Sequence, residues 1–207
     1  GGAPANFAYY AKQFGYDSMV VSAIGDDDLG MEIREVLDRA GLEYILDVPG
    51  YPTGTVEIDL DENGIPSYDI KENVAYDFIP FTPELKEVAR KCNVACFGSM
   101  TQRNPVSRNT IRRFLETMPQ TEETYKVFDI NLRQHFYNKE IISESLRICN
   151  VFKINDEELA VVSDMFGYEG MSDREVCRKI ISDWNLKYLI LTCGTNGSRI
   201  CTENESS

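Results

Sequence analysis

The stretch YKVFDINLRQHFYNKEIISESLRICNVFKINDEE, residues 125–158, decides the fold that we expect of this chain. It opens with a β-rich apolar run over residues 125–130 and continues with a helical pattern that has one apolar face. A second apolar run follows at residues 151–154. A strand, a crossover helix and a second strand in this order pair the two strands in parallel. The stretch therefore predicts an α/β protein.

Polar side chains follow both strands at the point where each strand is expected to end. Asp129, Asn131 and Arg133 come after the first strand, and residues 155–158, NDEE, come after the second. In open α/β sheets, ligands bind at the carboxyl ends of parallel strands. Capping of turns and helices would explain Asp129 and Asn155 equally well. The stretch alone leaves a ligand site and simple capping as even alternatives.

The charge balance narrows the classes of partner. The chain has 34 acidic and 21 basic residues and a formal net charge of -13. Nucleic acids and anionic membranes bind broad basic patches, so we expect neither as a partner. The 207 residues, 43% hydrophobic and 27% charged, are typical of a globular protein with one sizeable core.

Cysteine usage and the absence of targeting patterns favour a cytosolic protein. Six cysteines occur without a Cys-x-x-Cys pair, mostly in apolar patterns, which favours reduced core thiols over disulfides or a metal site. Neither a signal-peptide pattern nor an apolar run of about 18 residues occurs, so secretion and a membrane span are not supported. His135 is the only histidine and lies in a polar stretch, so Ser/His or Cys/His catalysis is not expected.

A double glycine precedes the first helical pattern. Gly1 and Gly2 would let a ligand approach the backbone N–H groups, and Asn6 adds a side chain that both donates and accepts hydrogen bonds. Hydroxyl-rich ligands need such pairing. We expect the helix to bury one apolar face and to end at Gly15. The residues expected on that buried face are Phe7, Tyr10, Ala11 and Phe14.

An acidic turn separates the next strand from the next helix. Residues 19–24 predict a buried strand, Asp28 is the expected N-cap, and the helix is expected to end at Gly41. The aspartates at residues 26–28 either cap this helix or contact a ligand, and capping is the favoured interpretation.

Residues 43–78 break the alternation of strands and helices. Polar and apolar side chains strictly alternate over residues 55–60, Asn63-Gly64 favours a turn, and residues 67–70 are typical of a second strand. Pro66 places that second strand near a sheet edge. The pattern predicts a half-exposed antiparallel hairpin. Its apolar face must cover its own domain, a bound ligand or a second subunit.

Strands and helices alternate again after residue 82. A strand at residues 94–97 precedes Gly98-Ser99, and the strand at residues 188–192 leads into a glycine-containing turn at residues 193–197. That turn suits a nucleotide lying against the backbone, and a plain hairpin turn explains it equally well. The chain has no P-loop motif, no G-x-G-x-x-G motif and no zinc-type spacing of His and Cys. A P-loop NTPase and a standard dinucleotide-binding fold are therefore not expected.

Seven motifs occur in an order that resembles the ribokinase-like (PfkB) carbohydrate kinase family, in particular its fructokinase-like members. They are GGAPANFA at residues 1–8, GDDDLG at 25–30, TGTV at 53–56, FGS at 97–99, DINLR at 129–133, NDEE at 155–158 and TCGTNG at 192–197. The first motif and the Asn-x-x-Glu pattern within NDEE are the most specific of them. The motifs extend along the chain almost from end to end.

The resemblance implies a three-layer α/β/α sandwich with a mostly parallel central sheet and a small β-sheet lid. Residues 1–42 and 79–207 would form the nucleotide- and sugar-binding domain, incomplete at both ends, and residues 43–78 the lid. The implied activity is transfer of the ATP γ-phosphoryl group, with Mg²⁺, to a hydroxyl of fructose or a related ketose or sugar acid. The alternative is a non-catalytic sugar- or nucleotide-binding protein of the same fold.

The resemblance also assigns site residues by motif. Gly2 and Asn6 would bind sugar hydroxyls, Arg133 would lie on the substrate side, and Glu158 would act at the magnesium. The residues implied for ATP binding are Asn155, Thr192, Gly194 and Gly197. Such residues suit phosphoryl transfer, which relies on positioning and on neutralising oxygen charge. The implied partners are a small sugar and ATP, and a homodimer through the lid is a further expectation.

One family motif is missing. The Gly-Ala-Gly-Asp motif, which supplies the catalytic aspartate and a helix N-terminus as anion hole, does not occur in these residues. No catalytic residue is assigned here, and the base is expected C-terminal to Ser207. Asp129 is not expected to replace it, because its motif resembles a structural and substrate-side element. The strand that normally precedes the double glycine is missing too, so the sequence resembles the interior of a longer chain.

Overall fold

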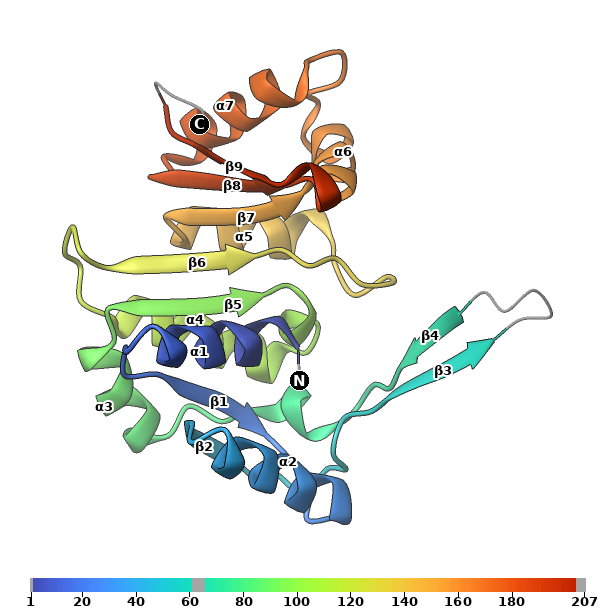
Figure 1. The fold of residues 1–207 in the computed structure, drawn as a ribbon, viewed down its shortest axis with the longest axis vertical. Coiled ribbons are helices and arrows are strands. Elements are labelled where there is room, and N and C mark those ends of the chain that lie inside the picture. Colours follow the sequence, from blue (N-terminus) through green and yellow to red (C-terminus); the bar gives the residue numbers. More distant parts are fainter. Residues whose placement is uncertain (1, 61–65, 204–207) are drawn as a thin grey trace. The chain divides into compact units, whose positions relative to one another are not determined.

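The chain divides into two compact units. The computed structural model describes residues 2–60 and 66–203 (Figure 1). Unit 1 comprises residues 1–85 and 104–110, and unit 2 comprises residues 86–103 and 111–207. Within the described residues, unit 1 contains two sheets of two strands each, and unit 2 contains one sheet of five strands.

The sheet of unit 2 confirms the expected α/β class. Its strands are β5 (Val94–Gly98), β6 (Tyr125–Asp129), β7 (Val151–Asn155), β8 (Tyr188–Thr192) and β9 (Ser198–Cys201). They pair in this order, with β5 to β8 parallel and β9 antiparallel to β8. Residues 125–158 form β6, the helix α5 and β7, as the opening stretch predicted. The arrows of β5 to β8 point the same way in Figure 1, so their carboxyl ends share one edge.

Helices alternate with the strands along the chain. The α-helices are α1 (Ala3–Gln13), α2 (Asp28–Arg39), α3 (Pro83–Lys91), α4 (Pro105–Thr117), α5 (Lys139–Ile148), α6 (Asp156–Phe166) and α7 (Asp173–Trp184). Short 3₁₀ helices occur at η1 (Ala75–Phe78), η2 (Met100–Gln102) and η3 (Gly194–Asn196). Within the described part of the chain, no helix combines the length and the apolar composition needed to cross a membrane.

A row of phenylalanine rings lies at the centre of the core of unit 2. Phe97, Phe128 and Phe152 occupy matching register positions of β5, β6 and β7. The ring centroids are 5.2 Å apart for Phe97 and Phe128 and 5.5 Å apart for Phe128 and Phe152. Phe128 and Phe152 each lie one residue before a polar residue at the sheet edge, Asp129 and Lys153. The core therefore directly supports the strand ends where the polar side chains gather.

Unit 1 begins with a β-α-β arrangement that corrects one prediction. β1 (Met19–Ala23) and β2 (Glu43–Asp47) pair in parallel, and α2 lies between them in the sequence. Residues 43–47 thus continue the α/β alternation, so the expectation that the break begins at residue 43 was wrong. The pairing of β2 depends on a strand on the other side of α2, and no local pattern in residues 43–47 indicates it.

The predicted hairpin is present in unit 1. β3 (Val56–Leu60) and β4 (Pro66–Ile70) pair antiparallel, with Val56 opposite Ile70. The expected Asn63-Gly64 turn lies outside the described residues. We call β3 and β4 the lid hairpin. Val56 and Ile58 are 51% and 58% exposed, so these two apolar side chains of β3 are left largely uncovered within the described structure.

The first helix, α1, buries a different face from the one predicted. Phe7, Tyr10 and Phe14 are exposed, Phe14 by 79%, whereas Ala8 is buried in a cluster with Leu37. The aromatic spacing marks an apolar stripe, but the small side chain of Ala8 is the one that packs against the rest of unit 1. Helical periodicity alone does not determine which face meets a neighbour.

The N-cap of α2 is Asp27 and not Asp28. The Asp27 carboxylate accepts a hydrogen bond from the backbone N–H of Gly30 at 2.8 Å, and Asp28 is the first helical residue. A carboxylate at the N-cap satisfies one of the N–H groups that a helix leaves unpaired in its first turn. The prediction that the Asp run caps this helix is confirmed, one residue earlier than expected.

Candidate functional site

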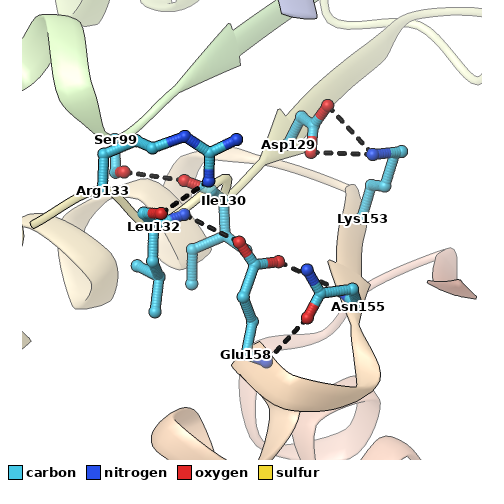
Figure 2. A network of polar contacts seen from close by, with 8 residues as sticks. All are labelled: Ser99, Asp129, Ile130, Leu132, Arg133, Lys153, Asn155 and Glu158. Atoms are coloured by element: carbon cyan, nitrogen blue, oxygen red, sulfur yellow. Dashed lines mark hydrogen bonds and ion pairs between the residues drawn. The ribbon is translucent and has the colours of Figure 1, made fainter. Parts of the chain in front are cut away.

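The segment after β6 is held in place by three parts of unit 2. The backbone N–H of Ile130 donates to the carbonyl of Lys153 at 3.1 Å, and the Ser99 hydroxyl donates to the carbonyl of Ile130 at 2.7 Å. The backbone N–H of Leu132 donates to the Glu158 carboxylate at 2.7 Å. Figure 2 shows the contacts of Ser99 with Ile130 and of Leu132 with Glu158. They fix the backbone of the DINLR motif at the sheet edge.

Asp129, the last residue of β6, forms an ion pair with Lys153, in the middle of β7. The Lys153 ammonium donates to both carboxylate oxygens of Asp129, at 3.0 and 3.1 Å (Figure 2). Asp129 is buried, and burial of a charged group is costly unless the group is paired. Because both oxygens face the ammonium group, Asp129 is poorly placed to accept a proton from a substrate. That Asp129 is not the catalytic base stays a prediction.

Lys153 was not singled out from the sequence. The available signal was a lysine inside the apolar run VFKIN, where a charged side chain requires a partner. Register supplies that partner, because Asp129 and Lys153 lie directly opposite each other in the β6–β7 pair.

Burial raises the pKa of the nearby Cys96 thiol to about 12, and the Asp129 charge adds to the effect. Cys96 therefore remains a neutral thiol beside the pair at neutral pH.

Asn155 and Glu158 form a capping box at the start of α6. The Asn155 side-chain oxygen accepts from the Glu158 N–H at 2.7 Å, and the Glu158 carboxylate accepts from the Asn155 N–H at 3.1 Å. Figure 2 shows Glu158 reaching both Asn155 and Leu132. The capping interpretation of Asn155 is thus confirmed. Among the described residues, the Asn155 side-chain nitrogen has no acceptor, so it can still donate to a ligand at the sheet edge.

The donor set at this edge fits a magnesium ion held through water. Glu158 is 9% exposed, and each of its two carboxylate oxygens already accepts one backbone N–H. A carboxylate offers about four lone-pair positions, so the remaining ones can accept hydrogen bonds from metal-bound water. Mg²⁺ usually keeps several waters. Within the part of the chain that the structure describes, no group of three or more His, Cys, Asp or Glu side chains forms a direct metal site.

The turn after β8 is a hairpin with an accessible backbone. Thr192 lies opposite Asn155 in the β7–β8 pair, so the two residues adjoin at the sheet edge. The Cys193 N–H donates to the Gly197 carbonyl at 2.8 Å, which closes the turn into the antiparallel strand β9. Gly194 and Gly197 have φ values of 52° and 85°, which favour glycine, and a Cβ at either would meet open space. The hairpin is confirmed, and contact with a nucleotide stays a prediction.

The remaining predicted site residues are exposed. Gly2, with φ of 90°, is the N-cap of α1, and its carbonyl accepts the backbone N–H of Asn6 at 3.1 Å. Asn6 is exposed, and its side chain has no hydrogen-bond partner among the described residues. In unit 2, the exposed Arg133 guanidinium donates to the Leu132 carbonyl at 2.7 Å. The structure therefore brings Asn155, Glu158 and Thr192 together in unit 2, while Gly2 and Asn6 belong to unit 1.

These features define a class of protein. It is an α/β protein with a mostly parallel sheet, polar side chains gathered at the carboxyl ends of β6, β7 and β8, and a separate β hairpin. The family follows from a direct comparison. The model of the pfkB family of carbohydrate kinases matches residues 1–207, and the chain belongs to this family.

Individual relatives are distant and longer than this chain. A fructokinase of Vibrio alginolyticus is 23% identical over 214 residues, covering 100% of this chain and 67% of the relative. The sugar kinase PH1459 of Pyrococcus horikoshii is 26% identical over 168 residues, and the match spans about half of that protein, 53%. The apo crystal structure of a fructokinase from Vibrio cholerae O395 has a TM-score of 0.81 at 23% identity, covering 100% of this chain and 71% of that one. These neighbours confirm the ribokinase-like fold.

Proposed function

We propose that the full-length protein is an ATP-dependent sugar kinase whose acceptor is fructose or a related ketose or sugar acid. The family match over residues 1–207 carries this proposal. The preference for fructose is supported by relatives named fructokinase, and the Vibrio cholerae fructokinase has also been solved with fructose, ADP and a calcium ion. We further propose a cytosolic location, which the six free cysteines support.

The sugar is proposed to bind at the exposed start of α1. Gly2 leaves the backbone open to a ligand, and the unpaired side chain of Asn6 can donate to one hydroxyl and accept from another. Arg133 is proposed to meet the sugar or the phosphate that it receives, because its guanidinium is exposed and keeps further donors beyond the one bonded to Leu132.

The nucleotide is proposed to lie along the carboxyl ends of β7 and β8. The free amide nitrogen of Asn155 and the hydroxyl of Thr192 can donate to phosphate oxygens, and the open backbone at Gly194 and Gly197 can lie against the rest of the nucleotide. Glu158 would hold magnesium-bound water. When bound, Mg²⁺ neutralises negative charge on the phosphate oxygens, which is the main requirement of phosphoryl transfer.

A substrate screen on the full-length protein tests the proposed function. Fructose, other ketoses, aldoses and sugar acids are each supplied with ATP and Mg²⁺, and ADP release is measured by a coupled assay. We expect sugar-dependent ADP release with a ketose or sugar acid. Binding of a sugar and of ATP by calorimetry without any ADP release would contradict the proposal and support a non-catalytic binding protein.

Asn155→Asp is expected to raise the KM for ATP about tenfold, as when a hydrogen bond to a phosphate oxygen is lost. Aspartate caps helices as well as asparagine, so the capping box with Glu158 should survive. The new carboxylate cannot donate and repels phosphate. ATP and sugar KM values are measured together with the thermal midpoint. An unchanged KM for ATP at an unchanged midpoint would mean that Asn155 only caps α6.

The exposed face of the lid hairpin is proposed to cover the sugar or to pair with a second copy. Val56 and Ile58 lie on one face of β3, while Glu57 on the other face forms an ion pair with Lys71 at 2.8 Å. Replacing Val56 and Ile58 by Ser is expected to raise the sugar KM about tenfold or to shift a dimer toward monomer. Steady-state kinetics measures the sugar KM, and light scattering measures the oligomeric state. Glu57→Ser is the control on the opposite face, and a double variant unchanged in both respects would show that the hairpin does neither.

A further inference from the structure

Two motifs that lie far apart in the sequence form one hydrogen-bonded unit. The Asp27 carboxylate accepts the Thr53 hydroxyl at 2.6 Å and the Thr53 backbone N–H at 2.8 Å, in addition to its cap on α2. These contacts tie the GDDDLG motif to the TGTV motif that leads into β3. The Thr53 hydrogen bonds also hold the pKa of Asp27 below its usual value, so the carboxylate is ionised at neutral pH.

The Thr53 hydroxyl completes the unit. While it donates to Asp27, it accepts the backbone N–H of Gly25 at 2.8 Å. A hydroxyl has one donor and two acceptor positions, and here it satisfies partners on both sides. Thr53 is 5% exposed and Gly25 is buried, so a missing hydroxyl would leave the Gly25 N–H without a hydrogen-bond partner.

Glycines make these close approaches possible. A Cβ at Gly25 would overlap the Asp27 carboxylate and the Thr53 backbone nitrogen, and a Cβ at Gly30 would overlap the carbonyl of Gly25. A Cβ at Gly54 would overlap the ring of Tyr76. Close approach requires glycine at these three positions. Gly25 and Gly30 therefore serve the Asp27–Thr53 contact, and Gly54, next to Thr53 in the sequence, serves the packing of Tyr76.

The second strand of the hairpin is tied to the same place. The Ala75 N–H donates to the Pro52 carbonyl at 2.8 Å, and the Lys71 N–H donates to the Thr55 carbonyl at 3.2 Å. The chain is thus bonded both before β3 and after β4. Figure 1 shows β3 and β4 extending away from β1, β2 and α2, with the end near residues 55 and 71 toward them. We call residues 25–30, 52–55 and 71–76 the stem.

We propose that Asp27 and Thr53 are positioning residues that set the orientation of the lid hairpin, and through it the affinity for the sugar. Only the second part of this inference, the effect on sugar affinity, rests on the proposed function. The lid hairpin is hydrogen-bonded to the rest of unit 1 through the stem, so a small rotation at Thr53 displaces the residues of β3 that lie farther from it most. Rigid support of this kind lowers the ordering cost of closing over a ligand.

The test compares Thr53→Val with Thr53→Ser in the full-length protein. Valine keeps the shape and removes the hydroxyl, whereas serine keeps the hydroxyl. We expect Thr53→Val to raise the fructose KM about tenfold, with kcat and the KM for ATP within about twofold of wild type. Amide hydrogen exchange in residues 53–60 and 66–76 should increase, because the stem opens more often. Thr53→Ser should restore both properties.

A second pair of variants covers the case in which Thr53→Val does not fold. Asp27→Asn removes the charge that accepts from Thr53, while Asp28→Asn changes an exposed aspartate in the same turn and serves as the control. If hydrogen exchange in both Thr53→Val and Asp27→Asn equals that of the wild type, the claim that Asp27 and Thr53 hold the lid hairpin is wrong. Increased exchange with an unchanged fructose KM overturns its role in sugar affinity. Because exchange is measured without turnover, a wild-type protein that phosphorylates no sugar refutes the proposed function and leaves the stem test intact.

Discussion

Glu158→Gln is expected to lower the free energy of unfolding by roughly 1.5–3 kcal/mol, and to shift activation by magnesium to higher concentrations. Both Glu158 oxygens accept backbone N–H groups, from Leu132 and from Asn155. Glutamine keeps one acceptor, but its NH₂ group must then face one of these N–H donors. The same substitution removes the negative charge that would hold magnesium-bound water. A structural role of Glu158 thus predicts a lower free energy of unfolding, whereas a metal role predicts a changed dependence of activity on magnesium.

Denaturant unfolding and a magnesium titration of activity separate the two roles. Glu157→Gln is the matched control, because Glu157 is exposed in the same first turn of α6 and shares the favourable position at the helix N-terminus. A magnesium curve that superimposes on wild type would leave Glu158 with a structural role alone. Unchanged stability would contradict the two-sided hydrogen bonding of this carboxylate.

The parts of the site that follow from local patterns were predictable from the sequence. The strand-helix-strand stretch at residues 125–158 has apolar periods that match its elements, and both strands end in polar residues. Asn155 and Glu158 have the spacing of a capping box, so their mutual contact needs no knowledge of the fold. The spacing does not show whether such a pair only caps the helix or also binds a ligand.

Contacts that depend on register or on distant segments were not predictable. The Asp129–Lys153 pair exists because β6 and β7 align these residues, and the bond from Leu132 to Glu158 joins a loop to a helix in another part of the sequence. Thr53 gave no sign of a contact with Asp27 beyond the presence of both in family motifs. Long-range contacts of this kind arise only once the strands have paired.

Helix α1 and strand β2 show how tertiary packing overrides a local pattern. The aromatic stripe of α1 suggested a buried face, yet the small Ala8 makes the close contact and Phe14 is exposed. Residues 43–47 were expected to belong to the segment that breaks the α/β alternation, yet they pair in parallel with β1. The sequence identified helix α1 but predicted no strand at residues 43–47, and in both cases the neighbouring element decided the burial or the pairing.

Phe128→Ala is expected to lower the free energy of unfolding of unit 2 by about 3–5 kcal/mol, the cost of deleting a fully buried aromatic ring and leaving a cavity. Phe128 is the middle ring of the row in β5, β6 and β7, so its loss removes contacts with both Phe97 and Phe152. It directly precedes Asp129 in β6, so the ring and the Asp129–Lys153 ion pair lie on opposite faces of the sheet. The midpoint of denaturant unfolding, followed by circular dichroism, measures the effect.

Met171→Ala is the control for this substitution, because Met171 is largely exposed in the segment between α6 and α7 and its truncation should change stability by less than about 0.5 kcal/mol. At low temperature, where the Phe128 variant remains folded, the sugar and ATP KM values should stay close to wild type, since the backbone bonds of Ile130 and Leu132 do not involve the ring. A loss of stability near that of the Met171 variant would contradict the packing of the phenylalanine row. A KM change without a stability change would show that the strand end moves independently of the core beneath it.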